Sequence, residues 1–130
     1  MIPRTLFPLA AFALVAQAAP AVAQPIQSFT MTKLQAAQKA GQPVLVDAFA
    51  SWCPVCRAQQ PTIEAMASDP RFKNLLILRL DYDNQTAEKK ALGITGQSTL
   101  ILFRGAKEIG RTRGENDAGK IRGFTARALG

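Results

Sequence analysis

A short apolar segment that runs straight into a pair of cysteines constrains the fold of this chain more than any other feature. The segment "PVLVDAF" occupies residues 43–49, and "ASWCPVC" follows it directly. A β-branched apolar run of this length is typical of a strand that is buried on both faces. The proline after Cys53 suits the first position of a helix, where its missing N–H costs nothing. We therefore expect a strand over 43–49, Cys53 as an N-cap, and a helix from Pro54 to Ala67 that Pro61 kinks.

The rest of the chain adds strands and helices around this unit. A buried strand, a crossover helix and a second buried strand form a parallel pair, and a closing hairpin adds an antiparallel edge. We predict an α/β fold, a three-layer α/β/α sandwich with a mixed sheet of four to five strands. Its remaining elements are expected to be strands at 26–29, 75–82, 99–103 and 108–114 and helices at 33–40, 86–92 and after Asp117, with Thr32 and Gln35 as the capping pair of the first helix.

The first 23 residues have the pattern of an export signal. Arg4 is followed by an uncharged apolar run, 6–16, which is shorter than the ~20 residues that span a bilayer. Ala21-Val22-Ala23 has the small-residue pattern of a signal-peptidase site. We expect cleavage after Ala23, which leaves one domain at 24–130; an uncleaved membrane anchor is the alternative.

The composition describes a basic chain with enough apolar residues for a packed core. Its formal net charge is +7 and its hydrophobic content is 48%. Such a charge is typical of a solvated basic face, or of a surface that meets an acidic partner or an anionic membrane. A nucleic-acid partner is not expected, because the chain is predicted to be exported and no basic-aromatic motif for that purpose occurs in it.

The two cysteines fit neither a metal site nor a structural staple. A structural zinc site takes four Cys or His ligands, whereas this chain has two cysteines and no histidine. A disulfide between Cys53 and Cys56 closes a very small loop, so it adds little stability. We therefore expect no metal.

Redox chemistry fits the two positions better. At the N-cap, the Cys53 sulfur faces unpaired amides and the positive end of the helix dipole, which favour a thiolate. Cys56 lies one turn deeper on the same face, where the two sulfurs can bond or separate with little backbone movement. An exposed nucleophile and a sheltered resolving thiol are what disulfide exchange requires, and oxidising compartments are where it occurs.

Two segments resemble the thioredoxin family, namely "VLVDAFASWCPVCRAQQP" at 44–61 and "GITGQSTLILFRGAKEIGRTRG" at 93–114. The resemblance implies a thioredoxin fold and a thiol-disulfide oxidoreductase that needs no cofactor. It implies that Cys53 attacks, that Cys56 resolves the mixed disulfide, and that the two form a redox disulfide. Asp47 resembles the buried acid that takes the proton of Cys56, although an acid at a strand end is the alternative. Trp52 resembles the indole that flanks the site.

Other positions follow from the same resemblance. Arg79 resembles a lysine near the buried acid, and Arg57 either adds positive potential or is simply solvated. Ser98 stands where the family has a cis proline before "TL". We expect the Gln97–Ser98 bond to be trans, because a cis bond there costs ~2.5–4 kcal/mol. We also expect the Ser98 hydroxyl to bind a thiolate or a client backbone, and the range of clients to be narrow.

The direction of electron flow is a further expectation. Strong oxidants of the family have a histidine between the cysteines, whereas this chain has Pro54-Val55. Residues 30–53 resemble the periplasmic domain of a membrane protein that carries reductant across the bacterial inner membrane. We therefore expect a monomeric periplasmic reductase that passes electrons from an inner-membrane thiol donor to oxidised client proteins. An oxidase or isomerase, and a redox-independent chaperone or binding module for cytochrome or metal maturation, remain alternatives.

Overall fold

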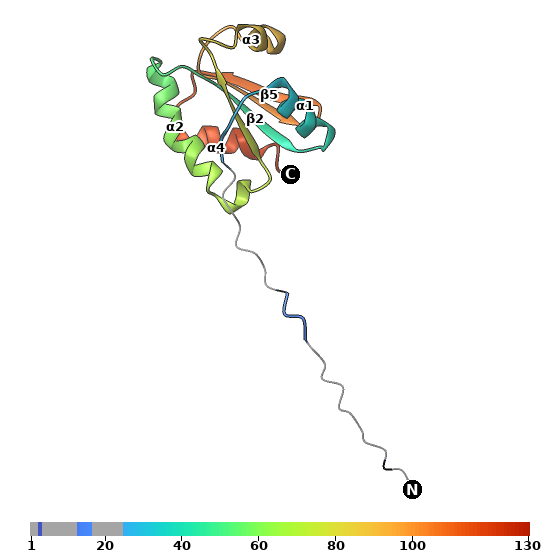
Figure 1. Cartoon of the computed structure of the whole chain (residues 1–130). Coiled ribbons are helices and arrows are strands. Elements are labelled where there is room, and N and C mark those ends of the chain that lie inside the picture. Colours follow the sequence, from blue (N-terminus) through green and yellow to red (C-terminus); the bar gives the residue numbers. More distant parts are fainter. Residues whose placement is uncertain (1–2, 4–12, 17–24) are drawn as a thin grey trace.

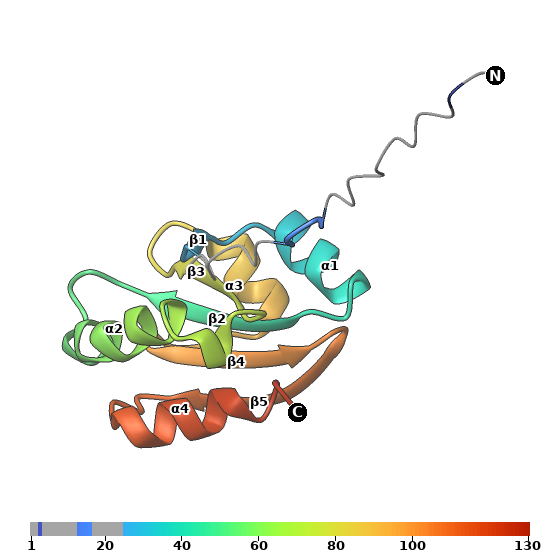
Figure 2. The same ribbon diagram turned by 90° about the horizontal axis from the view of Figure 1, so that it is seen from below.

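The computed structural model describes residue 3, residues 13–16 and residues 25–130. The predicted cleavage site at Ala23 lies outside the described residues. Five strands form one sheet with helices on both faces (Figures 1 and 2). The elements are β1 Gln27–Ser28, α1 Met31–Lys39, β2 Pro43–Phe49, α2 Pro54–Ala67, the 3₁₀ helix η1 Pro70–Phe72, β3 Leu76–Asp81, α3 Thr86–Leu92, β4 Thr99–Arg104, β5 Lys107–Arg113 and α4 Ala118–Ala126.

The sheet has the order β1-β3-β2-β4-β5, so the cysteine-bearing strand–helix unit starts from its centre. β2 pairs parallel with β3 and antiparallel with β4, and β5 is an antiparallel edge strand. The predicted α/β/α sandwich with a mixed sheet is confirmed. β2 and α2 have the predicted bounds, 43–49 and 54–67.

Side chains of β2 point alternately into two cores, which places Asp47 on a defined face. Val44, Val46 and Ala48 belong to the core beneath α1, whereas Leu45 belongs to the core beneath α2 and α4. Figure 2 shows α1 and α3 on one side of the sheet and α2 and α4 on the other. Asp47 alternates with Ala48, so it points toward the α2 face.

The first helix begins two residues earlier than predicted. Thr30, and not Thr32, is its N-cap, and the Thr30 hydroxyl accepts a hydrogen bond from Lys33 N at 3.1 Å. Phe29 before the cap and Leu34 in the helix are both buried in the same core. This pair has the spacing of a hydrophobic staple, which fixes where the helix starts. The predicted pairing of Thr32 with Gln35 is therefore wrong.

The last helix has the predicted cap. Asp117 accepts a hydrogen bond from Lys120 N at 2.9 Å, and Ile121 of this helix is fully buried against the sheet. Across the part of the chain that is described, no helix has both the length and the apolar character needed to cross a membrane.

Candidate active site

The two cysteines lie where β2 leads into α2. Cys53 has an extended backbone and is the N-cap of α2, with Pro54 in the first turn. Its Sγ accepts a hydrogen bond from the backbone N–H of Cys56 at 3.1 Å. The sulfur thus replaces the oxygen of an ordinary capping side chain at the positive end of a helix dipole, an environment that favours negative charge.

Cys53 is more enclosed than the sequence predicts, whereas Cys56 is sheltered as predicted. Cys53 is only 2% exposed and Cys56 is fully buried, so the prediction of an exposed Cys53 is wrong. Ala50 is buried with the cysteines, and the partly buried side chains that pack against them are Phe49, Val55 and Tyr82. Tyr82 follows β3, and only the tertiary fold brings it to the cysteines.

Cys56 is held as a thiol. Burial, together with the hydrogen bond that the Cys56 thiol donates to the Cys53 side chain, raises the pKa of the Cys56 thiol to about 11. Its Sγ lies 3.8 Å from the carbonyl oxygen of Ala48, which it approaches as a weak donor. Neither cysteine is in a disulfide. For Cys56 to act as a nucleophile near neutral pH, a base must therefore remove its proton.

Asp47 is the buried acid of this site. It is completely inaccessible to solvent, and its Oδ2 accepts a hydrogen bond from Gln60 Nε2 at 3.1 Å. Arg79 Nε lies 3.6 Å from the same oxygen, which confirms that Arg79 is near the acid. Burial raises the pKa of the Asp47 carboxyl, although the Gln60 hydrogen bond and the Arg79 charge act in the opposite direction. Its Oδ1 has no hydrogen-bond partner within the described chain, so one lone-pair face is free to take a proton.

Gln60 connects this acid to the cysteine turn, and sequence reasoning missed it. Its Nε2 also donates to the carbonyl oxygen of Cys56 at 3.3 Å, and its Oε1 accepts from Arg79. Gln60 lies four residues after Cys56 and therefore on the same side of α2. The signal in the sequence was a polar residue four positions after the cysteine that is expected to be sheltered, which places its amide beside that cysteine.

The loop before β4 is also held against the cysteine strand. Within the described residues no peptide bond is cis, so the prediction of a trans Gln97–Ser98 bond is confirmed. Ser98 has a φ of 60°, in the left-handed region, and its N–H donates to the carbonyl of Ala48 at 2.9 Å. Its hydroxyl donates to the Gln97 carbonyl at 2.6 Å and not to a thiolate as predicted.

Gln59 fastens this loop from the side of α2. The residue is fully buried, and its Nε2 donates to the carbonyl oxygens of Ser98 at 3.3 Å and Glu115 at 2.8 Å. The Ser98 carbonyl also accepts from Gly114 N at 3.1 Å. Both backbone groups of Ser98 are therefore occupied within the chain, while half-buried Gln97 lies beside them.

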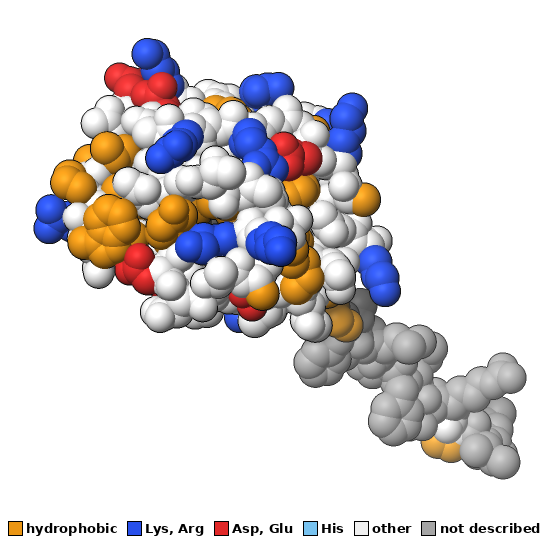
Figure 3. All heavy atoms as spheres, turned by 90° about the horizontal axis from the view of Figure 1, so that it is seen from above, with side chains coloured by type: hydrophobic (Ala, Val, Ile, Leu, Met, Phe, Trp, Pro, Cys, Tyr) orange, Lys and Arg blue, Asp and Glu red, His pale blue; other side chains and the backbone are white. Residues whose placement is uncertain are grey.

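Trp52 forms the exposed rim of the site. It is 54% exposed, and its Nε1 lies 3.0 Å from both carboxylate oxygens of Asp83. Its ring meets Tyr82 edge to face, with centroids 6.5 Å apart. Asp83 and Tyr82 were not predicted. Figure 3 shows a group of apolar side chains on one part of the face seen from above, with basic side chains distributed around it.

The other predicted positions are on the surface. Pro54, Arg57 and Pro61 are all exposed on α2. Among the described residues Arg57 has no ion pair or side-chain hydrogen bond, and both interpretations of it, added positive potential and simple solvation, stay predictions.

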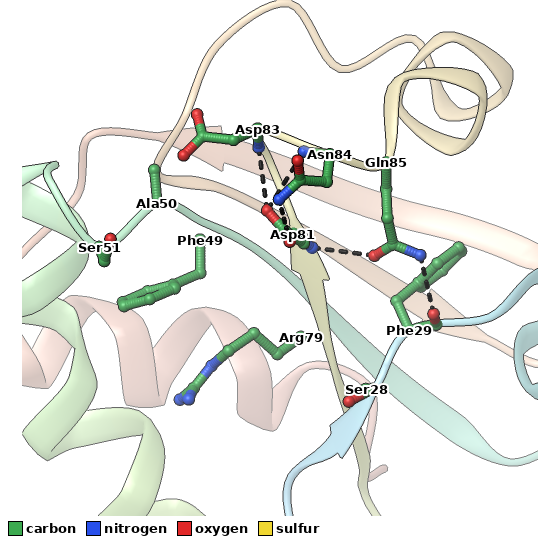
Figure 4. Close-up of a pocket in the computed structure, with 10 residues that line it drawn as sticks. All are labelled: Ser28, Phe29, Phe49, Ala50, Ser51, Arg79, Asp81, Asp83, Asn84 and Gln85. Carbon is green, nitrogen blue, oxygen red and sulfur yellow. Dashed lines mark hydrogen bonds between the residues drawn. The ribbon is translucent and has the colours of Figure 1, made fainter.

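A cavity of about 540 Å³ lies next to the cysteine turn. Figure 4 shows Arg79 running beneath Phe49 toward α2, while the carboxylate of Asp81 is held by Asn84 and the backbone of Asp83. The cavity is therefore bounded by Arg79, the charged neighbour of the buried acid, while Asp47 itself does not line it. Its lining residues are Ser28, Phe29, Phe49, Ala50, Ser51, Arg79, Asp81, Asp83, Asn84 and Gln85.

Known proteins are similar to this chain in both sequence and fold. The family model described as Thioredoxin matches residues 26–127. A thioredoxin of Chlamydia muridarum is 39% identical over 74 residues, which cover 57% of this chain and 71% of that protein. A protein disulfide-isomerase of Humicola insolens is 29% identical over 114 residues, 88% of this chain but 23% of that protein. The crystal structure of Trxlp from Edwardsiella tarda EIB202 superposes with a TM-score of 0.75 at 32% identity, covering 78% of this chain and 98% of that one.

Proposed function

Because the chain belongs to the thioredoxin family and is a thiol-disulfide oxidoreductase, we propose that it is an exported reductase of oxidised client proteins. Its electrons come from a thiol donor in the inner membrane. The observation that carries the proposal is the capping contact at the start of α2, where Cys53 Sγ accepts the Cys56 N–H at 3.1 Å. That contact favours a thiolate at Cys53. The residues between the two cysteines, Pro54 and Val55, carry no positive charge that would stabilise the thiolate further.

In the first step the Cys53 thiolate attacks one sulfur of a client disulfide. A bond forms between Cys53 and that client sulfur, the client S–S bond breaks, and the second client sulfur leaves as a thiolate. Trp52, 54% exposed beside Cys53, supplies apolar contact area for the client chain. Because Cys53 itself is 2% exposed, the residues packed around it must move aside before the client sulfur can reach its Sγ.

In the second step Cys56 resolves the mixed disulfide. The Cys56 proton passes to Asp47, whose raised pKa makes it a better base than an ordinary carboxylate. The resulting Cys56 thiolate attacks Cys53 Sγ, the bond between Cys53 and the client breaks, and the client sulfur leaves as a thiolate that takes up a proton. Two electrons have then moved to the client, and Cys53 and Cys56 are joined by a disulfide.

The reducing direction follows from what stabilises the Cys53 thiolate. In a strong oxidant the reduced form is strongly stabilised, whereas here no charged residue stands between the cysteines to add to the effect of the capping amide. We expect a potential nearer to the roughly −270 mV of thioredoxin than to the roughly −120 mV of the strong periplasmic oxidant. Equilibration with glutathione buffers, read out by mass after thiol alkylation, measures this value. A potential close to that of the strong oxidant would contradict the reductase direction.

Export is supported by the apolar run at 6–16 and the small residues Ala21 and Ala23, and the membrane donor by the resemblance of residues 30–53 to the periplasmic domain of a reductant carrier. The test is the N-terminus and redox state of the protein in cell fractions. We expect a periplasmic protein that starts at Gln24 and has mostly reduced cysteines. A Cys56→Ser variant should trap clients and donor as mixed disulfides.

Isomerase or oxidase activity is the second candidate. The likeness to a protein disulfide-isomerase over 88% of this chain favours it. Mostly oxidised cysteines in cells would support an oxidase. Faster recovery of enzyme activity from scrambled ribonuclease than from reduced ribonuclease would support an isomerase. A redox-independent binding module is separated from both by Cys53→Ser, because such a module would keep its function.

A further inference from the structure

Gln60 contacts each polar group around the buried acid at the same time. Its Nε2 donates to Asp47 Oδ2 at 3.1 Å and to the Cys56 carbonyl at 3.3 Å, while Oε1 accepts from Arg79. Both N–H groups and the oxygen of the amide are therefore used. The mechanism above does not need any of these contacts to move electrons, so the role of Gln60 has to be found elsewhere.

The chemistry of the three partners fixes the orientation of this amide. Asp47 and the Cys56 carbonyl can only accept hydrogen bonds, and Arg79 can only donate them. If the amide were flipped, its oxygen would face two acceptors and its NH₂ group would face a cation. The carboxamide is thus locked, and it holds the Asp47 carboxylate at a fixed place relative to the turn that carries Cys56.

We propose that Gln60 is a positioning residue that holds Asp47 for proton transfer and sets the pH range in which this acid takes up a proton. The inference rests on the proton-acceptor role proposed above for Asp47. A neutral donor stabilises the ionised carboxylate without placing a second full charge in the core. The lowering effect of Gln60 on the pKa of Asp47 agrees with this geometry.

The other groups around Asp47 leave Gln60 as its shortest polar contact. Arg79 on β3 is the charged neighbour, 3.6 Å away and 32% exposed, so water screens part of its effect. Leu100 on β4, the register partner of Asp47, is apolar. On α2 and at its cap the buried titratable side chains are those of Cys56 and Cys53, whereas Arg57 and Glu64 are exposed.

The test uses two substitutions and a matched control. Gln60→Leu removes the donor at similar volume, and Gln60→Glu keeps the shape but adds a carboxylate that pairs with Arg79. Gln35→Leu is the control, because Gln35 is an exposed glutamine on α1, away from the site. Thermal unfolding checks each variant, and Gln60→Glu keeps the test open if Gln60→Leu does not fold.

The first readout is the titration of Asp47 itself, followed by ¹³C NMR of reduced protein with labelled aspartate. The Asp47 signal is identified by its absence from Asp47→Asn. We expect the midpoint to rise by about one pH unit in Gln60→Leu, which lowers the ionised fraction below the midpoint about tenfold. It should rise further in Gln60→Glu, because a like charge is added. Gln35→Leu should titrate like the wild type.

The second readout is the pH profile of the resolving step, measured as release of a model disulfide from Cys53. A parallel upward shift of titration and rate profile supports the inference. Titration midpoints that coincide with the wild type overturn it and leave the role of Asp47 standing. A shifted titration with an unchanged rate profile overturns the role of Asp47, and the inference fails with it.

Discussion

Asp47 and Arg79 occupy paired positions on β2 and β3, and Arg79 Nε lies 3.6 Å from Asp47 Oδ2. The two residues are buried unequally, since the Asp47 side chain is fully buried and the Arg79 side chain is 32% exposed. The Asp47 carboxylate has lost its hydration, while the Arg79 guanidinium keeps part of its own. The Nε of Arg79 also lies beyond ordinary hydrogen-bond distance of Asp47 Oδ2. Burial therefore outweighs attraction, and the pKa of Asp47 is raised.

Asp47→Asn should stabilise the fold and slow the resolving step. A raised pKa in the folded state means that the wild type loses stability as the pH rises from the usual value of 3.8 through the raised folded value. The asparagine variant lacks this loss. Its advantage should therefore be absent at pH 3.5, grow with pH, and reach a plateau of about 1–4 kcal/mol above the folded pKa. Urea unfolding at several pH values checks it.

The same variant should slow the resolving step about 100-fold near neutral pH, because a general base is lost. Insulin reduction and single-turnover release of a model disulfide measure this. Wild-type turnover in a more stable Asp47→Asn protein would show that Asp47 takes no part in proton transfer.

The two cysteines should differ strongly in alkylation. At pH 7 we expect iodoacetamide to label Cys53 first and Cys56 hardly at all, because the pKa of Cys56 is raised to about 11. Labelling of Cys56 should rise about tenfold per pH unit between pH 7 and 9, as its thiolate fraction does. Since Cys53 is 2% exposed, it should react more slowly than a solvated thiolate. Peptide mass spectrometry follows both sites, and faster labelling of Cys56 would reverse the assigned roles.

Ser98→Gly should stabilise the protein. Ser98 has a φ of 60°, which costs roughly 1–2 kcal/mol for a residue with a Cβ and nothing for glycine. The greater freedom of glycine in the unfolded chain offsets part of the gain, so we expect about 0.5–1 kcal/mol in denaturant unfolding. Ser98→Ala is the control, because it removes the hydroxyl and keeps the Cβ.

Ser98→Pro should have the opposite effect on stability. Proline fixes φ near −65° and has no N–H, whereas Ser98 has a φ of 60° and donates to Ala48 O at 2.9 Å. We expect a loss of about 3 kcal/mol unless the loop adopts another conformation. If the loop does so, reduction of generic disulfide substrates should rise. A variant with wild-type stability and wild-type substrate range would contradict both expectations.

Gln59→Leu should loosen the loop that faces the cysteines. The substitution leaves the Glu115 carbonyl without its 2.8 Å donor and removes one of two donors to Ser98 O. It also removes the buried Gln59 Oε1, which has no partner in the described chain, so the net cost should be only about 1–2 kcal/mol. Hydrogen exchange should accelerate at residues 96–99 and 113–116, while Gln35→Leu leaves it unchanged.

Local sequence patterns were sufficient for the central strand and the cysteine helix. "PVLVDAF" and the proline after Cys53 fix both boundaries, because apolar β-branched runs and N1 prolines act within a few residues. The start of α1 was missed because two threonines compete for the cap. The burial of Phe29 and Leu34 in the same core decides between them, and their spacing is visible in the sequence once a cap at Thr30 is considered.

The surroundings of the site could not be predicted in the same way. Tyr82 and Asp83 reach the cysteine turn from the end of β3, about thirty residues away in the chain, and they determine how enclosed Cys53 is and where Trp52 lies. The partners of Gln59 and Gln60 likewise come from the loop before β4, from the segment after β5 and from β2 and β3. These contacts depend on sheet order and register.

The adjacent pair Gln59–Gln60 has a consequence for protein engineering. Neighbouring residues on a helix point about 100° apart, so one amide reaches the Ser98 loop and the other reaches the buried acid. A four-residue graft of the C-P-V-C sequence into another scaffold would transfer the sulfurs without these anchors. To transplant the reactivity, a designer would have to move the two glutamines together with Asp47, Arg79 and the Ser98 backbone, as one unit drawn from four separate stretches of chain.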